Sequence, residues 1–144
     1  MRPLIVRLAT RYGGALHRVL YRVSGGRIGA RVWGLPIVLL TTTGRETGRA
    51  RTVPLCSLRD DERFVVIASY GGLDRSPSWW LNLQREARAS VQLGNETRAV
   101  VARETSGDER TRLWAEVTAR APGYLDYQRR TARQIPVVLL EPAQ

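Results

Sequence analysis

The sequence is poor in the residues that most often carry disulfide, metal and acid–base chemistry. It has one cysteine, Cys56, and one histidine, His17. A single cysteine excludes an internal disulfide and any site built from several cysteines. A single histidine excludes a histidine-based metal cluster and disfavours a Ser-His-Asp triad. We therefore expect no metal site in this chain.

Lysine is absent, and so is any long apolar run. All 23 basic residues are arginines, and the formal net charge is +10. No stretch of about 18 apolar residues occurs, which excludes a membrane-spanning helix. The first residues lack the apolar core and cleavage site of a signal peptide, so we expect a cytoplasmic protein. The positive charge favours phosphorylated ligands, nucleic acid or anionic lipid as partners.

The remaining composition is that of one folded domain. A chain of 144 residues with 43% hydrophobic and 25% charged residues can bury a core of ordinary size. The acidic residues fall in predicted turns or on helix faces, and no nucleophile–base pair stands out. If the chain is an enzyme, we expect a bound cofactor to supply the difficult chemistry.

The most informative stretch spans residues 39–55 and reads LLTTTGRETGRARTVPL. Two apolar segments flank a turn that carries Arg45, Arg49 and Arg51 beside several threonine hydroxyls. Glycines in the turn allow the backbone to bend and to bring N–H groups close to a ligand. The pattern predicts two strands joined by a basic turn that binds a phosphate or a carboxylate. The alternative is a solvated hairpin tip that happens to be basic.

Short apolar runs separated by turn residues predict strands from residue 35 onward. The six candidate strands are residues 35–43, 52–59, 63–70, 89–93, 96–103 and 135–140. The candidate helices are residues 78–86, 108–120 and 123–134. Tight turns join consecutive strands, which favours hairpins over parallel crossovers. The expected fold is mainly β, an antiparallel barrel of about six strands with helices packed outside.

Residues 4–23 have the apolar periodicity of an amphipathic helix with an arginine-rich side. Two arrangements fit this pattern. The helix either packs on the domain and shows its arginines to water, or lies on an anionic membrane surface. The second arrangement predicts peripheral attachment to the inner face of the cell membrane.

Three segments carry a resemblance to a known family. They are LTTTGRETGRARTVPL, VVIASYGGLDRSPSWWLNL and PGYLDYQRRTARQIPVVLLEP. Their order and spacing resemble those of the deazaflavin-dependent nitroreductase and quinone reductase family, which consists of split β-barrel proteins related to FMN-binding oxidoreductases. The resemblance covers about residues 30–142. It implies an N-terminal helical extension, residues 1–30, and a deazaflavin-binding split barrel, residues 31–144.

The resemblance also implies an activity. Family members bind coenzyme F420 and pass a hydride from its reduced form to a quinone, a nitroaromatic compound or a similar conjugated acceptor. The implied cofactor-binding residues are Arg45, Glu46, Thr47, Arg51, Val53, Pro54, Leu55, Ala68, Ser69, Tyr70, Gly71, Trp79, Trp80, Asn82 and Tyr124. The implied catalytic residues are Tyr124, Tyr127 and Ser69, on the acceptor side of the ring.

Three positions depart from the family pattern. Glu46 stands where a lysine is common, which removes one positive charge from the basic turn. Tyr70 stands where a lysine or an asparagine is common. Cys56 stands where an aromatic residue is often found, which opens the substrate side.

Two other functions fit the same residues. The first is an oxidoreductase of the same fold that binds FMN. The second is a non-catalytic basic module that binds a cofactor or nucleic acid. The aromatic residues cluster with glycine-rich loops and do not alternate with arginines along a strand, as a single-strand platform requires, so we expect no nucleic-acid partner. Both a monomer and a homodimer fit the sequence.

Overall fold

Strands are the main secondary structure of the computed structural model, which describes residues 31–32 and 35–144. The strands are β1 (Arg31–Val32), β2 (Leu35–Thr43), β3 (Ala50–Cys56), β4 (Leu58–Asp60), β5 (Arg63–Ile67), β6 (Arg88–Leu93), β7 (Glu96–Glu104) and β8 (Val137–Pro142). The helices are the short 3-10 helix η2 (Tyr70–Gly72), α3 (Ser78–Arg85), α4 (Gly107–Arg120) and α5 (Gly123–Arg129). The predicted helix over residues 4–23 lies outside the described residues.

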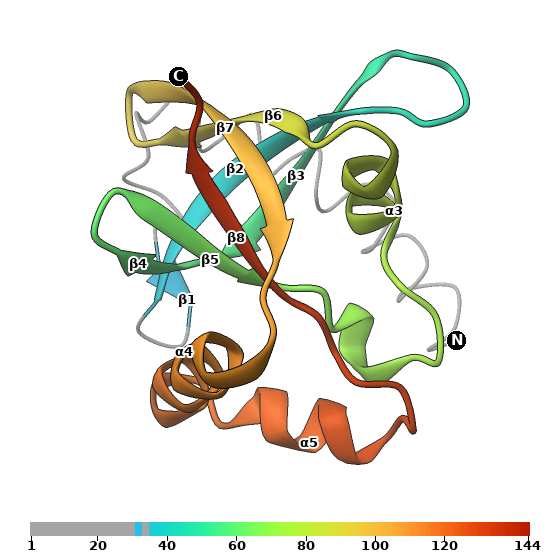
Figure 1. Cartoon of the computed structure of the whole chain (residues 1–144), viewed down its shortest axis with the longest axis vertical. Coiled ribbons are helices and arrows are strands. Elements are labelled where there is room, and N and C mark those ends of the chain that lie inside the picture. Colours follow the sequence, from blue (N-terminus) through green and yellow to red (C-terminus); the bar gives the residue numbers. More distant parts are fainter. Residues whose placement is uncertain (1–30, 33–34) are drawn as a thin grey trace, which may run out of the picture.

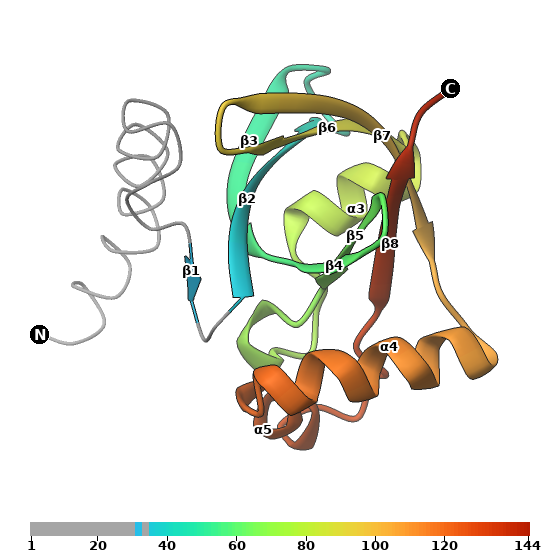
Figure 2. The same ribbon diagram turned by 90° about the vertical axis from the view of Figure 1, so that its left-hand side faces the viewer.

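The strands form one antiparallel sheet that curls into a barrel (Figures 1 and 2). Its order is β1-β2-β6-β7-β8-β5-β4. β3 lies off this path and also pairs with β2. Only Ser57 separates β3 from β4, and its N–H donates to the Pro36 carbonyl at 2.9 Å. The corner at Ser57 therefore joins the two ends of the sheet. The predicted fold class, an antiparallel barrel with peripheral helices, is confirmed.

The strand boundaries differ from the prediction at two places. The predicted strand over residues 52–59 is divided into β3 and β4, because the chain changes its pairing partner from β2 to β5 at Ser57. The predicted strand over residues 63–70 ends at Ile67, because Ser69 is helical and the next three residues, Tyr70 to Gly72, have positive φ angles that turn the chain away from the sheet. The described sheet has eight strands. Two of them, the short strands β1 and β4, are not distinguished as separate strands by the sequence pattern.

The helix α5 ends at Arg129, five residues before the predicted end at residue 134. The side chain of Gln128 replaces the backbone hydrogen bonds of a longer helix. Its amide donates to the Arg133 carbonyl at 2.8 Å and accepts from the Ile135 N–H at 3.0 Å. The segment between α5 and β8 is therefore an ordered loop.

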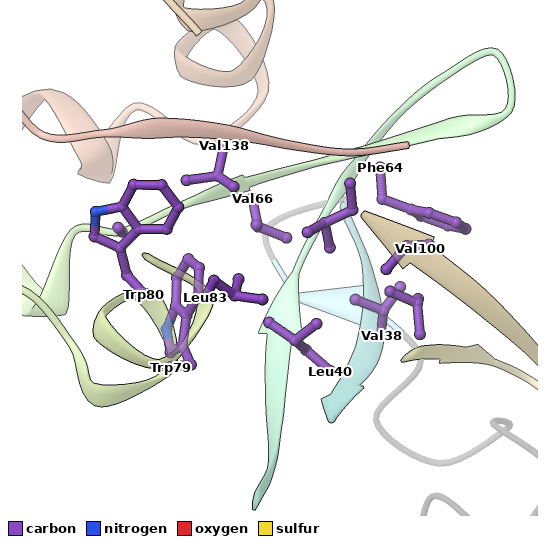
Figure 3. Close-up of a cluster of buried hydrophobic side chains, with 12 residues drawn as sticks. Val38, Leu40, Phe64, Val66, Trp79, Trp80, Leu83, Val100 and Val138 are labelled. Atoms are coloured by element: carbon purple, nitrogen blue, oxygen red, sulfur yellow. The ribbon is translucent and has the colours of Figure 1, made fainter. Parts of the chain in front are cut away.

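The barrel has an inner core and an outer core, and alternate residues of the same strands supply both. Phe64 and Val66 of β5 face the inner core, whereas Val65 and Ile67 face the outer core. Figure 3 shows the inner core, where Trp80 and Leu83 of α3 meet side chains from the strands. Burying each large aliphatic side chain contributes about 1.5–3 kcal/mol.

The helices cover different parts of the barrel. Figure 2 shows α3 within the outline of the ring of strands, and Figure 1 shows it at one side, so α3 closes one end of the barrel. Leu113 and Val117 of α4, with Tyr124 of α5, pack in the outer core against β5 and β8. No helix among the described residues is long and apolar enough to cross a membrane.

Candidate active site

Two cavities meet beside α3 and form one groove. The first, which we call the polar arm, has a volume of about 470 Å³ and lies against the turn between β2 and β3. The second, the apolar arm, has a volume of about 870 Å³ and lies between β3, η2 and α5. Val53, Ser78 and Trp79 line both arms. A single elongated ligand can therefore occupy the two arms together.

The polar arm is bordered by a tightly closed turn. The Gly44 N–H donates to the Arg49 carbonyl at 2.8 Å, and the Gly48 N–H donates to the Gly44 carbonyl at 2.8 Å. A Cβ atom at Gly44 would lie only 2.9 Å from the Thr47 hydroxyl, so the turn leaves no room for a side chain there. These contacts fix the turn before any ligand binds.

Asn82 of α3 anchors this turn. It is 3% exposed, and its Oδ1 atom accepts from the Arg45 backbone N–H at 3.1 Å and from the Arg45 Nη1 at 2.9 Å. Its Nδ2 atom donates to the Thr42 hydroxyl at 3.1 Å. Asn82 therefore fixes the position of Arg45 at the cavity wall. A buried amide is suited to this role because its polar atoms are satisfied by hydrogen bonds.

Arg51 is the second arginine of the polar arm. It lies on β3 directly opposite Thr42 of β2, and its side chain is exposed. It forms no salt bridge with any of the residues that the structure describes. Arg45 and Arg51 together present two cationic groups to the cavity, and Glu46 in the same lining offsets part of this charge. This donor set suits an anion such as a phosphate or a carboxylate.

The apolar arm is lined by β3 on one side and by α5 and the segment after β5 on the other. Tyr124 and Tyr127 pack edge to face, with ring centroids 5.9 Å apart. Burial raises the pKa of Tyr124 well above its ordinary range, with smaller contributions from Cys56 and Tyr127. Burial also raises the pKa of the Cys56 thiol. The Tyr124 hydroxyl therefore remains protonated at neutral pH and can donate a hydrogen bond.

Most of the residues predicted for the site border this groove. In the polar arm these are Arg45, Glu46, Thr47, Arg51 and Asn82, and in the apolar arm Pro54, Leu55, Ser69, Tyr70, Gly71, Tyr124 and Tyr127. Val53 and Trp79 border both arms. These residues therefore lie around the same groove, as a shared binding site requires. The role of each residue stays a prediction.

Ala68 and Trp80 do not line either arm. Both are buried in the inner core, although the sequence predicted them to bind the cofactor. The Ala68 N–H donates to the Pro136 carbonyl at 3.0 Å, and its own carbonyl accepts from Arg133. Trp80 follows Trp79 on α3, and adjacent residues of a helix point in different directions, so only Trp79 reaches the groove.

Other lining residues were not in the predicted set. Leu73, Pro77 and Ser78 border the apolar arm, and they lie in the same segment as the tryptophan pair. Their proximity to that pair in sequence is the one signal that could have indicated them. Among the described residues, no group of three or more His, Cys, Asp or Glu side chains is placed to hold a metal ion.

The curled antiparallel sheet with its peripheral helices places this chain in a class of protein, the split β-barrel proteins. The sequence profile of the F420H(2)-dependent quinone reductases matches residues 15–142. An F420H(2)-dependent quinone reductase of Mycobacterium tuberculosis is 40% identical over 129 residues, which cover 87% of each chain. This chain therefore belongs to the F420H(2)-dependent quinone reductase family.

Solved structures agree with this assignment. An F420-H2 dependent reductase is 39% identical and superposes with a TM-score of 0.69 over 74% of this chain and 94% of its own. A domain-swapped dimer is 33% identical with a TM-score of 0.72 over 98% of this chain and 100% of its own. A pyridoxamine 5'-phosphate oxidase-like protein from Listeria innocua, 11% identical with a TM-score of 0.52 over 75% of this chain and 84% of its own, shares the fold.

The family assignment confirms the predicted enzyme class. The chain is an F420-dependent reductase, its cofactor is coenzyme F420, and neither FMN nor a non-catalytic role is favoured. The residues of the groove fit such a cofactor. The polar arm offers cationic groups to an anionic tail, and the apolar arm offers flat walls to a ring.

Proposed function

We propose that reduced coenzyme F420 binds along both arms of the groove and that the enzyme reduces a quinone held in the apolar arm. The observation that carries this proposal is the continuity of the two arms through Val53, Ser78 and Trp79. A ring in the apolar arm and an anionic tail in the polar arm then belong to one molecule. The family to which the chain belongs supports the quinone as acceptor.

The polar arm holds the phosphate and the acidic tail of the cofactor in this proposal. Arg45, Thr47 and Arg51 supply guanidinium and hydroxyl donors, and the fixed turn supplies the geometry. Each guanidinium–anion hydrogen bond contributes about 1.5–3 kcal/mol, and less where solvent screens it. Val53, Pro54 and Leu55 then border the ring.

The acceptor side uses the hydroxyls of Tyr124, Tyr127 and Ser69. When bound, reduced coenzyme F420 supplies a hydride equivalent. The quinone oxygen that becomes negative must gain a hydrogen bond and then a proton, which comes from a tyrosine hydroxyl or from water. Tyr124 can donate this hydrogen bond because its hydroxyl is protonated at neutral pH, and burial raises its pKa further. The apolar walls exclude water and align the acceptor with the cofactor. This alignment accounts for much of the increase in the rate of hydride transfer.

Several finer assignments belong to this proposal. Nitroaromatic compounds are a further class of acceptor, as the resemblance to the family implies. We also infer a cytoplasmic protein, with residues 4–23 as a contact to anionic membrane lipid. A homodimer is favoured over a monomer, because a 33% identical solved relative is a domain-swapped dimer.

A titration followed by tryptophan fluorescence tests the cofactor assignment. Trp79 lines both arms, so a bound ring should quench its emission. Coenzyme F420 should quench at about micromolar concentration, and FMN should quench little. The variant Arg51→Ala should weaken coenzyme F420 binding about tenfold, through the loss of one charge-assisted contact.

Arg49→Ala is the matched control, because Arg49 belongs to the same turn but borders neither arm. Its affinity for coenzyme F420 should equal that of the wild type. An unchanged affinity in Arg51→Ala at low salt would refute the assignment of the polar arm. Quenching by FMN alone would keep the fold and change the cofactor.

A further inference from the structure

Arg133 lies in the loop between α5 and β8 and binds the segment that follows β5. Its Nε atom donates to the Leu73 carbonyl at 2.8 Å. Its Nη2 atom donates to the Ser69 carbonyl at 2.8 Å and to the Ala68 carbonyl at 3.2 Å. One guanidinium thus holds three carbonyls of a segment that forms a wall of the apolar arm.

This segment has an unusual backbone. Tyr70, Gly71 and Gly72 have φ angles of 47°, 64° and 82°, so three consecutive residues are left-handed. Such a conformation is unfavourable for Tyr70, which has a Cβ atom, and persists only when surrounding contacts determine it. The hydrogen bonds from Arg133 flank the three residues on both sides and are among those contacts.

The loop that carries Arg133 is itself fixed to α5. The Gln128 amide donates to the Arg133 carbonyl at 2.8 Å, so the backbone of Arg133 is anchored to the helix that carries Tyr124 and Tyr127. Arg133 therefore connects the two walls of the apolar arm that face each other, the tyrosines of α5 and the segment with Ser69.

We propose that Arg133 is a positioning residue that fixes Ser69 relative to Tyr124 and so sets the geometry at the acceptor. It does not line either arm, and it acts through the backbone that it holds. A planar guanidinium can serve three carbonyls in a fixed fork, which the single ammonium of lysine cannot reproduce. This inference rests on the proposed function.

Kinetics of Arg133→Lys and Arg133→Ala, with menadione as acceptor, test the proposal. Both variants should lose about 10- to 100-fold in kcat, because a displaced wall misaligns the acceptor. Their affinity for coenzyme F420 should fall much less than kcat, because Arg133 holds a wall beside the ring and makes no contact with the basic turn that binds the tail. Millimolar guanidinium ion should restore part of kcat in Arg133→Ala, where it has space, and not in Arg133→Lys.

Arg129→Ala is the control, since Arg129 ends α5, is 73% exposed and pairs only with Asp126 among the residues that the structure describes. It should retain the wild-type kcat. If Arg133→Lys also retained the wild-type kcat, charge alone would suffice and the proposed fork geometry would be wrong. Equal losses of kcat and cofactor affinity, with a lower Tm, would indicate a general structural role instead.

Hydrogen–deuterium exchange provides a readout that does not depend on activity. Amides of residues 69–74 should exchange faster in both Arg133 variants, with unchanged protection in the barrel strands. Unchanged exchange in residues 69–74 would overturn the proposal. If wild-type protein neither bound coenzyme F420 nor reduced menadione, the proposed function would fail, and the exchange data would still decide whether Arg133 fixes this wall.

Discussion

Tyr124 and Tyr127 are three positions apart on α5 and differ in their surroundings. Tyr124 is 7% exposed and belongs to the outer core, whereas Tyr127 is half-buried at its margin. The edge-to-face contact between the rings fixes their relative orientation. The rings serve packing, whereas a role at the acceptor needs the hydroxyls. Substitution by phenylalanine removes only the hydroxyl and therefore tests the role at the acceptor separately.

We expect Tyr124→Phe to lower kcat for menadione about 100-fold, since a protonated donor at the developing oxyanion is lost. Tyr127→Phe should have a smaller effect of the same sign. Neither variant should change the affinity for coenzyme F420 by more than about twofold, because the polar arm is intact. Steady-state kinetics and fluorescence titration of the same samples give both quantities. Parallel losses of kcat and affinity would argue against the acceptor-side placement.

At the residue scale, sequence reasoning succeeded where a site is local. Arg45, Thr47 and Arg51 of the basic turn are close in sequence, so their proximity in the polar arm follows from one hairpin. Asn82 and Arg133 were harder to interpret, because each acts on a segment far away in the chain. When a side chain holds a segment that is distant in sequence, the residues next to it in the chain show no pattern that reveals the contact.

At the scale of elements, the contact between η2 and α5 is unusually close. A Cβ atom at Gly72 would lie 2.7 Å from the Tyr127 carbonyl oxygen and 3.0 Å from the Tyr127 Cα. Gly72 also has a φ of 82°, where L side chains are strained. The segment and the helix can therefore approach only because position 72 has no side chain.

We expect Gly72→Ala to lower the free energy of unfolding by about 2–4 kcal/mol, from the left-handed backbone and the clash together. Gly71→Ala is the matched control, because Gly71 has a φ of 64° but a Cβ atom there would meet nothing within 4 Å. It should cost only about 1–2 kcal/mol. Urea unfolding of both variants measures the difference. Equal losses of stability in the two variants would show that η2 and α5 can move apart at little energetic cost.

Element boundaries were predictable where turn chemistry marks them. Gly94-Asn95 joins β6 to β7 as expected, with Gly94 at a φ of 61°. The corner at Ser57 was not predictable, because the apolar pattern continues while the pairing partner changes from β2 to β5. Pairing partners are a tertiary property, and a strand's own residues do not encode them.

At the scale of the whole molecule, a network of ion pairs joins the β4–β5 hairpin, β7, β8 and α4. Arg103 bonds to Glu109 at 2.7 Å and to Glu141 at 2.8 Å, and Arg63 contacts Asp60 and Glu109. The hydrogen bond from Arg103 lowers the pKa of Glu109 below its ordinary value of 4.5. The hydrogen bond from Arg112 does the same for the pKa of Asp60, below 3.8.

These shifts predict loss of stability in acid. A carboxyl whose pKa is lower in the folded state stabilises the fold above its unfolded pKa and loses that contribution as pH falls through the folded value. We therefore expect Tm to be steady above about pH 5 and to fall below about pH 4.5. Both carboxyls remain partly exposed, at 19% for Asp60 and 30% for Glu109, so the effect should shrink in about 1 M salt.

Glu109→Gln tests the contribution of this network to the acid response. Its Tm at neutral pH should be lower than that of the wild type, and its Tm should fall less steeply in acid, because one titrating carboxyl has been removed. Thermal unfolding followed by circular dichroism across this pH range measures both. The same slope in the variant and the wild type would show that other carboxyls govern acid unfolding.

The position of β8 has a consequence for how the protein is made. β8 is the last strand of the barrel along the chain, yet it pairs with both β5 and β7 in the middle of the sheet. A nascent chain on the ribosome therefore carries two open strand edges until β8 emerges, and such edges are prone to pairing with other chains. The barrel that bounds the cofactor groove closes only with this strand, so the coenzyme can stabilise the closed barrel but not a ribosome-bound fragment that lacks β8.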